Sequence, residues 1–492
     1  MRQSIIRRAD VICIAVLISA YIPGVLQRSL WSDDYTTLVA PDEAKSLHLS
    51  DARPIYAYIN IASFYFFNNE HSARFLKFFG LMGIIAIYSF LSWVLKEQDY
   101  SFKNRLIVAI ALLVPSFQMP AHWAHAWVLS WTAFFGLLAS YLWSRNSLHR
   151  RLVGIILYSV SIATYPPTAV FNFAAIVVLG SLKKESNFQI FVALRRNTVL
   201  FLASSILSFA NSLWLMTVLD YPRADRLRIV TLNEIPEKVF WLLSRPVTAS
   251  LRPFMIDSPS PLVAMMTALP VLVLILLGLA RDCKKSRQKL MRRTLIISFG
   301  LLFSIAPLIV SPQNQIEFRL ISGISWGIAS LTILYLLDAF KALEHIIWRT
   351  KLPILQGISI TALIVILIVN TNVRFTNLFG NSFQVNKLAI QGSIKNCEKR
   401  GPIYAVGILE LEGVIPRKSN LGIYSAYSDL YFPGLSEKVV FYFTAKEYGL
   451  SKEQIFTIET SEFGELPGVC TFDLNDLESL FKDQKRKASN LN

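Results

Sequence analysis

The sequence predicts a polytopic α-helical membrane protein with about eleven transmembrane helices and a small C-terminal α/β domain. Its 492 residues are 53% hydrophobic and only 17% charged, whereas soluble domains carry about 25% charged residues. Apolar runs of membrane-spanning length recur up to about residue 372. Beyond that point the pattern changes to short runs of β-branched and aromatic residues, which is typical of strands in a soluble domain.

A helix needs about 20 apolar residues to cross ~30 Å of hydrocarbon. Eleven runs approach this length, and the third, fifth and sixth are short enough to tilt, break or re-enter. Total counts of ten to twelve spans stay open. The predicted spans are 10–27, 73–95, 104–118, 124–143, 151–164, 167–182, 197–219, 262–280, 294–311, 320–340 and 353–371.

The basic residues predict the orientation. With the N-terminus in the cytoplasm, the cytoplasmic segments hold 23 Lys and Arg in 66 residues, against ten in 107 residues on the outer side. This excess follows the positive-inside rule. It also explains the net charge of +16 without a nucleic-acid partner, because basic loops face anionic membrane lipids. The sequence contains no zinc-type Cys/His spacing, no GxxxxGK[ST] loop and no GxGxxG turn.

We expect two domains. The membrane domain covers 1–372, with long outer loops at 28–72 and 220–260, and the soluble α/β domain covers 373–492. Eleven spans with a cytoplasmic N-terminus place this second domain on the outer side of the membrane. Cys397 and Cys470 fall in it, where an oxidising compartment permits a disulfide; two unpaired buried thiols are the alternative. The expected strands are "GPIYAVGILEL", "KVVFYFTA", "EQIFTIET" and "GVCTFDL".

The first outer loop contains "WSDDYTTL", in which Asp33 and Asp34 are adjacent, beside Trp31 and Tyr35. Adjacent carboxylates can serve as a general base and its orienting partner, because their environments can separate their pKa values. Carboxylate oxygens can also bind a divalent cation. A solvated polar loop after a helix end is the alternative. The aromatic stretch that follows, "SDARPIYAYINIASFYFF", is expected to lie along the membrane surface.

Two further motifs lie on the outer side. "PSFQMPAHWAHAW" places His122 and His125 three residues apart, which predicts that both face one side of a helix, with Trp123 between them. A metal or substrate contact is one interpretation, and interfacial aromatic residues at a span end are the other. "TYPPTAVFN" places Tyr165 before two prolines. It predicts either a simple helix stop or a break that exposes backbone beside a cavity.

Arginines also lie on the outer side, against the orientation rule. Arg223, Arg226 and Arg228 open the loop at 220–260, and an arginine can bind phosphate through its two-pronged guanidinium. Pairing with the acidic residues of the same loop is the alternative. Glu317 and Arg319 lie at the mouth of the tenth predicted span, where charged residues are costly and therefore functional candidates; a structural ion pair is an equal alternative.

The order of these motifs resembles the GT-C superfamily of lipid-linked glycosyltransferases. Within it, the chain resembles the serotype-converting O-antigen glucosyltransferases of phages and bacteria over nearly its whole length. The family's Gly-Arg-Pro appears here as Ala52-Arg53-Pro54, a departure that bears on the placement of Arg53. The motifs are "WSDDY", "DARPIYAYI", "RFLKFFGLMGIIAIYSFL", "ATYPPTAVFNF" and "EFRLISG", followed by the terminal α/β domain.

The resemblance implies transfer of a hexose, with glucose as the expected sugar, from undecaprenyl phosphate to lipid-linked O-antigen repeats of lipopolysaccharide. The reaction would occur at the periplasmic face of a bacterial inner membrane. Asp34 would be the base and Asp33 its orienting partner, or the reverse, and a single displacement would invert the anomeric configuration. The donor phosphate would be bound by Arg319, Arg53, Arg223 and Arg226. The sugar and acceptor contacts would be Trp31, Tyr35, His122, Trp123, His125, Tyr165 and Glu317.

No metal or cofactor is assigned, because superfamily members differ in metal dependence, and a divalent cation stays open. Two other functions also stay open. One is a transporter or flippase for a lipid-linked saccharide, which would place ionisable residues inside the spans. The other is an O-antigen polymerase or ligase. The acidic pair in a loop after the first span favours the transferase over both.

Overall fold

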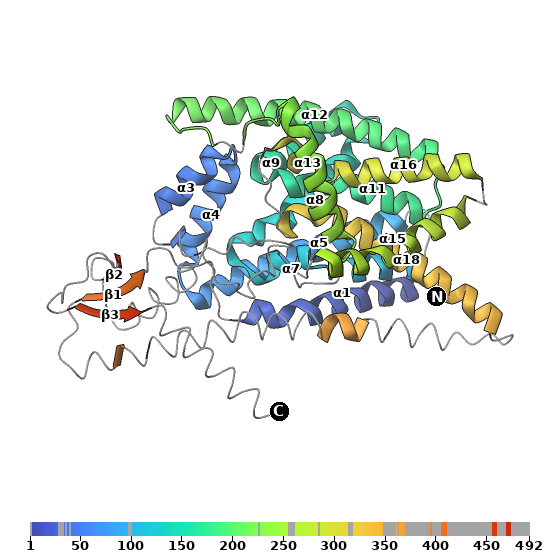
Figure 1. Ribbon diagram of the computed structural model, residues 1–492, viewed down its shortest axis with the longest axis horizontal. Coiled ribbons are helices and arrows are strands. Elements are labelled where there is room, and N and C mark those ends of the chain that lie inside the picture. The colour runs from blue at the N-terminus through green and yellow to red at the C-terminus, as the bar shows by residue number, and fades with distance from the viewer. Residues whose placement is uncertain are drawn as a thin grey trace.

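The structure is a computed structural model (Figure 1). It describes residues 2–27, 34, 37–38, 41–96, 101–224, 227–253, 261–283, 286–312, 318–347, 361, 364–369, 391, 394–395, 405–410, 455–459 and 469–473.

Helices make up nearly all of the described chain before residue 348. The first are α1 (Arg2–Leu26), α3 (Pro41–Ser50), α4 (Pro54–Phe66), α5 (Glu70–Lys96), α6 (Phe102–Ala111), α7 (Pro115–His122), α8 (Trp127–Trp143), α9 (Leu148–Thr164), α10 (Pro166–Ala169), α11 (Phe171–Leu182) and α12 (Asn187–Val218). They are followed by α13 (Ile235–Leu242), α14 (Thr248–Ser250), α15 (Pro261–Asp282), α16 (Arg287–Phe303), α17 (Ala306–Val310) and α18 (Ser322–Ile347). Short turns join them at η1 (Ala124–Ala126), η3 (Leu232–Glu234), η4 (Leu243–Val247) and η5 (Phe318–Ile321).

By length and hydropathy, this chain is a multi-pass membrane protein. Within the described residues, five helices are long and apolar enough to cross a membrane, and the pair α6 and α7 would make a sixth. That pair bends by 67° because Val114, which precedes Pro115, is extended (φ −62°, ψ 151°), as residues before proline usually are. Helices also lie over the other predicted spans up to residue 340. The eleventh, 353–371, falls mostly outside the described residues.

Ion pairs join helix ends that are predicted to be cytoplasmic. Arg105 of α6 pairs with Asp10 of α1 at 3.0 Å. Asp338 of α18 pairs with Lys103 of α6 and, at 3.1 Å, with Arg281 of α15. These ends of α1, α6, α15 and α18 therefore lie close together. Figure 1 shows α3 and α4 at the opposite end of the helical body from the N-terminus of α1.

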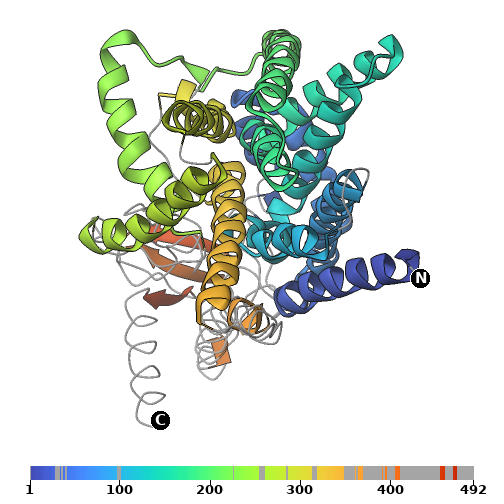
Figure 2. The same ribbon diagram turned by 90° about the vertical axis from the view of Figure 1, so that its right-hand side faces the viewer.

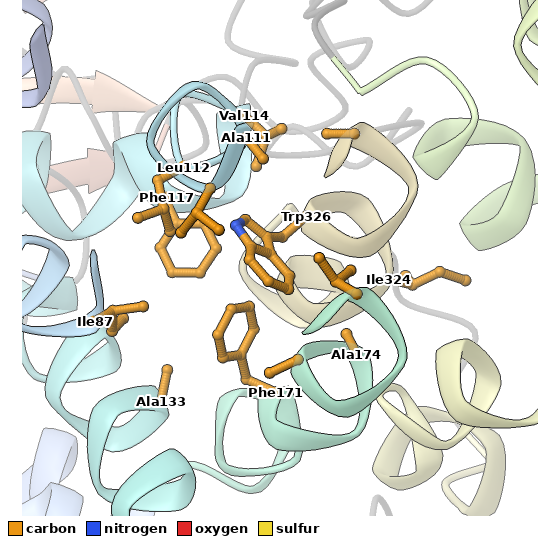
Figure 3. Close-up of a cluster of buried hydrophobic side chains, with 14 of the residues drawn as sticks. Ile87, Ala111, Leu112, Val114, Phe117, Ala133, Phe171, Ala174, Ile324 and Trp326 are labelled. Carbon is orange, nitrogen blue, oxygen red and sulfur yellow. The ribbon is translucent and has the colours of Figure 1, made fainter. Parts of the chain in front are cut away.

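Buried aromatic rings hold α7, α11 and α18 side by side. Phe171 of α11 contacts Trp326 of α18, with ring centroids 4.9 Å apart, and Phe117 of α7, at 5.4 Å. Figure 3 shows the three rings pointing toward one another among small aliphatic side chains. The packing holds the starts of α7, α11 and α18 together, and Figure 2 shows the same bundle turned by 90°.

Two glycines let neighbouring helices approach closely. A Cβ at Gly80 of α5 would lie 1.8 Å from the carbonyl oxygen of Pro120 in α7. A Cβ at Gly136 of α8 would lie 2.3 Å from the carbonyl oxygen of Ala169 in α10. Small residues commonly permit such approaches between membrane helices. The glycines therefore permit the close approach of α7 to α5 and of α10 to α8.

The turn between α3 and α4 positions Arg53. The Ala52 N–H donates to the carbonyl of Leu49 at 2.9 Å, and the Arg53 N–H donates to the carbonyl of His48 at 3.0 Å, which is the Schellman pattern of helix termination. Ala52 has a φ of +56°, a left-handed conformation that favours glycine. Here alanine adopts it, and Pro54 starts the next helix.

Replacing Ala52 with Gly is expected to raise the free energy of unfolding by about 0.5–1 kcal/mol. The relief of left-handed strain, ~1–2 kcal/mol, exceeds the extra chain entropy of glycine, ~0.5–1 kcal/mol. Thermal unfolding of the full chain in detergent measures the change. Ala52→Val should shift the midpoint the other way, because a β-branched residue tolerates positive φ poorly. A less stable Ala52→Gly protein would contradict this account.

Three strands lie in the C-terminal part: β1 (Ala405–Glu410), β2 (Ile455–Glu459) and β3 (Val469–Asp473). They form a parallel sheet in the order β2-β1-β3. Each falls within a run predicted to be a strand, and the fourth run, "KVVFYFTA", lies outside the described residues. Cys397 also lies outside them, and Cys470 is described only as a position in β3 opposite Val406. The proposed disulfide therefore stays a prediction.

Candidate functional site

Asp34 is fully buried (0% exposed), so it does not lie in a solvated loop. Its Oδ1 accepts a hydrogen bond from the backbone N–H of His125 at 2.7 Å. Three residues further along the sequence, Thr37 Oγ1 lies 3.3 Å from His125 Nδ1. The part of the chain that carries Asp34 and Thr37 is therefore docked on the segment just before α8. The other residues of this motif that were predicted to act, Asp33, Trp31 and Tyr35, lie outside the described residues.

Aromatic side chains surround the His125 ring. His48 of α3 and Tyr56 of α4 both lie 5.2 Å from it, measured between ring centroids. Trp123 stacks on it at 5.9 Å. The Tyr56 hydroxyl also donates to the His125 carbonyl at 3.2 Å. His125 thus connects the loop of Asp34 with α3 and α4, although 91 residues separate it from Asp34.

The prediction that His122 and His125 share one helix face is wrong. Helix α7 ends at His122, and Trp123 is extended (φ −116°, ψ 117°) before η1 begins. The His122 ring instead lies against α1, where a Cβ at Gly24 would be 1.6 Å from its Cδ2 and Tyr21 is 5.9 Å away. The break separates the two histidines, so only His125 joins the cluster around Asp34.

Two of the predicted phosphate-binding arginines lie beside His125. The Arg53 guanidinium is 4.7 Å from the ring centre of Tyr165, and that of Arg319 is 4.9 Å from the ring centre of Trp123. The charges of both guanidinium groups act on His125. Arg53 is also 3.9 Å from Asp51, and 16% of its side chain is exposed. Both guanidinium groups therefore stack on aromatic rings of the cluster around His125.

Tyr165 occupies the helix break that its prolines predict. Helix α9 ends at Thr164, Tyr165 is extended (φ −154°, ψ 94°), and Pro166 begins α10. The ring of Tyr165 is buried and lies 5.7 Å from that of Tyr56. The break therefore brings Tyr165 from the end of α9 to the same cluster.

The remaining predicted arginines differ in their settings. Arg223 is exposed, and the neighbouring Ala224 N–H donates to the carbonyl of Ser50 at 3.1 Å, next to the turn that carries Arg53. Arg226 and Glu317 lie outside the described residues.

Arg228 pairs with an acidic residue of its own loop, which is the structural alternative to phosphate binding. It forms two hydrogen bonds to Glu234, at 2.7 and 3.0 Å. These bonds, together with those from Thr231, lower the pKa of Glu234 to about 2. The Arg228 guanidinium is therefore paired with a carboxylate within the same loop.

Several residues of the cluster were not predicted. They are buried and lie within 28–72, the predicted first outer loop: Thr37, His48, Asp51 and Asn60. The spacing of Tyr56 and Asn60, four residues apart in "PIYAYINIASF", is a signal that both lie on one helix face. His48 and Asp51 carry no comparable signal in the sequence.

Fold and site together define a multi-pass helical membrane protein with a buried polar and aromatic cluster at one end of the bundle. The cluster contains two carboxylates, Asp34 and Asp51, and two arginines, Arg53 and Arg319. Among the described residues, no group of three or more His, Cys, Asp and Glu side chains could hold a metal ion. No family model, curated protein or solved structure matches the chain.

Proposed function

We propose that this chain is a GT-C-like glycosyltransferase of a bacterial inner membrane. It would move a hexose, with glucose as the first candidate, from undecaprenyl phosphate to lipid-linked O-antigen repeats on the periplasmic side. The observation that supports this proposal most directly is the convergence of Asp34, Arg53 and Arg319 around His125. A buried carboxylate beside two guanidinium groups suits a reaction in which a proton is removed and a phosphate leaves.

The proposed reaction is a single displacement. The acceptor hydroxyl oxygen attacks the anomeric carbon, and its proton passes to the Asp34 carboxylate, with Asp33 as the alternative base. The bond between the anomeric carbon and the phosphate oxygen breaks, and undecaprenyl phosphate leaves with the bonding electrons. Arg53 and Arg319 would stabilise its negative charge, with Arg223 and Arg226 as further candidates. Attack opposite the leaving group inverts the anomeric configuration.

The direct test supplies the purified full chain with radiolabelled undecaprenyl phosphate glucose and a lipid-linked O-antigen acceptor. Labelled acceptor is the expected product. Other polyprenyl phosphate hexoses serve as further donors. If none donates its sugar while liposomes containing the protein translocate lipid-linked saccharide, the transporter alternative replaces the transferase.

The proposed topology has about eleven spans, a cytoplasmic N-terminus and a periplasmic α/β domain at 373–492. Single cysteines at two exposed positions test it in a chain whose four native cysteines are replaced. Asn68→Cys should react with a membrane-impermeant maleimide in intact cells, because Asn68 lies in the first outer loop. Gln288→Cys should react only after permeabilisation. The reverse labelling pattern would overturn the topology. The native Cys283 is a poor probe because it is buried.

A further inference from the structure

Asn60 lies on the face of α4 that contacts His125. Residues four apart in a helix share a face, so Tyr56, Asn60 and Phe64 form one row. The two ends of this row both contact the His125 ring, Tyr56 at 5.2 Å and Phe64 at 6.2 Å between ring centroids. Asn60, in the middle of the row, therefore faces His125.

Buried polar atoms without a partner are found on both sides of this contact. Asn60 is 1% exposed, and neither its Oδ1 nor its Nδ2 has a hydrogen-bond partner among the described residues. His125 is also 1% exposed, and its Nε2 is without a partner in the same part of the chain. Proteins leave few buried polar atoms unpaired, because each costs free energy. Three such atoms in one place point to a bound polar group.

Every other polar group of His125 is engaged. The backbone N–H donates to Asp34, the carbonyl accepts from Tyr56, and Nδ1 lies next to Thr37 Oγ1. These contacts fix the ring, so that Nε2 has a defined direction. A fixed ring with one free nitrogen is suited to binding a ligand atom at a set distance from the Asp34 carboxylate.

The chemistry of the three atoms suits hydroxyl groups. An amide offers a donor and an acceptor, and a sugar hydroxyl both donates and accepts. Asn60 carries no charge that would attract phosphate, whereas the nearby Arg53 and Arg319 are positively charged. We infer that Asn60 and His125 Nε2 bind hydroxyl groups of the sugar at this site. The inference rests on the proposed function and adds Asn60 to the residues that contact substrate.

Asn60→Leu tests the inference, because leucine has a similar volume and no polar atom. The unfolding midpoint of this variant, without substrate, should be no lower than that of wild type. Asn172→Leu is the matched control: Asn172 is also 1% exposed, but its amide bonds to Tyr158 and Asn197. Removing the Asn172 amide should lower the unfolding midpoint. A midpoint for Asn60→Leu that falls as far as that of Asn172→Leu would assign Asn60 a structural role and overturn the inference.

Sugar discrimination gives the second measurement. Wild type should use undecaprenyl phosphate glucose at least tenfold better, in kcat/KM, than at least one of its deoxyglucose analogues, because a site that hydrogen-bonds a hydroxyl rejects the analogue without it. Asn60→Leu should lose at least tenfold on glucose and reduce that ratio to about threefold or less. The same comparison with deoxy acceptor glycans distinguishes a donor sugar from an acceptor sugar. Unchanged ratios in both comparisons would overturn the inference while leaving the transferase intact.

A binding measurement separates this inference from the proposed function. If wild type transfers no sugar, its unfolding midpoint is compared with undecaprenyl phosphate glucose and with undecaprenyl phosphate alone. A shift that depends on the sugar and disappears in Asn60→Leu would support the site and reject transfer. A shift that persists in the variant, or no sugar-dependent shift in wild type, would overturn the inference.

Discussion

Replacing Asp34 with Asn is expected to lower kcat for sugar transfer by about 10²–10⁴-fold, the usual contribution of a general base. Asparagine keeps a side-chain oxygen that can accept the hydrogen bond from the His125 N–H, so the loop stays docked. It cannot take a proton from the acceptor hydroxyl. The measurement is single-turnover transfer from radiolabelled undecaprenyl phosphate glucose, beside thermal unfolding of the same preparation.

Two further variants complete this test. Asp34→Leu removes the hydrogen bond as well as the base, so it should also lower the unfolding midpoint, which Asp34→Asn should not. Asp33→Asn tests the other candidate base, and the base is the residue whose amide variant loses the larger factor. Transfer at the wild-type rate by both amide variants would leave Asp34 as an anchor of the loop and remove it from the chemistry.

Replacing either Arg53 or Arg319 with Gln is expected to lower kcat/KM by about 10²–10³-fold, the scale observed when one group that stabilises transition-state charge is removed. Both cations would act on the phosphate as it leaves, so the loss should appear mainly in kcat. Arg53→Lys and Arg319→Lys should recover only part of it, because lysine keeps the charge but not the planar fork or the aromatic stacking.

Arg228→Gln is the matched control. Arg228 lies on the outer side by the same prediction, but Glu234 already neutralises it, so transfer should stay within about twofold of wild type, as for an exposed ion pair of small energetic weight. If Arg228→Gln reduced transfer as strongly as Arg53→Gln, the loss would reflect the overall positive charge of the outer face. The assignment of Arg53 and Arg319 to the donor phosphate would then be wrong.

Local signals in the sequence predict the helices well. The Pro115 break and the stop at Tyr165 follow from proline, which restricts the residue before it and lacks an N–H. The placement of Arg53 follows from the turn after α3, and alanine holds that turn in the conformation expected of glycine. These features depend on a few neighbouring residues, which is why the sequence suffices to find them.

Contacts between distant segments could not be predicted in the same way. The spacing of His122 and His125 suggests a shared helix face only if the helix is continuous, and the extended backbone of Trp123 breaks it. Nothing near Asp34 in the sequence indicates that its partner is a backbone N–H at residue 125. The spacing of Asn60 and Tyr56 indicates a shared helix face, but it does not show that this face is buried, because the burial of Asn60 depends on how α4 packs.

The hydrogen bond that docks Asp34 has a consequence for how this region can vary. Its donor is the main chain at position 125, and every amino acid except proline supplies the same N–H. This hydrogen bond is therefore independent of the side chain at position 125, whereas the contact of Nδ1 with Thr37 Oγ1 and the direction of Nε2 both depend on the histidine. Position 125 can change through evolution or in a saturation library while the main-chain hydrogen bond to Asp34 is kept, so its side chain is available for altering which sugar is accepted.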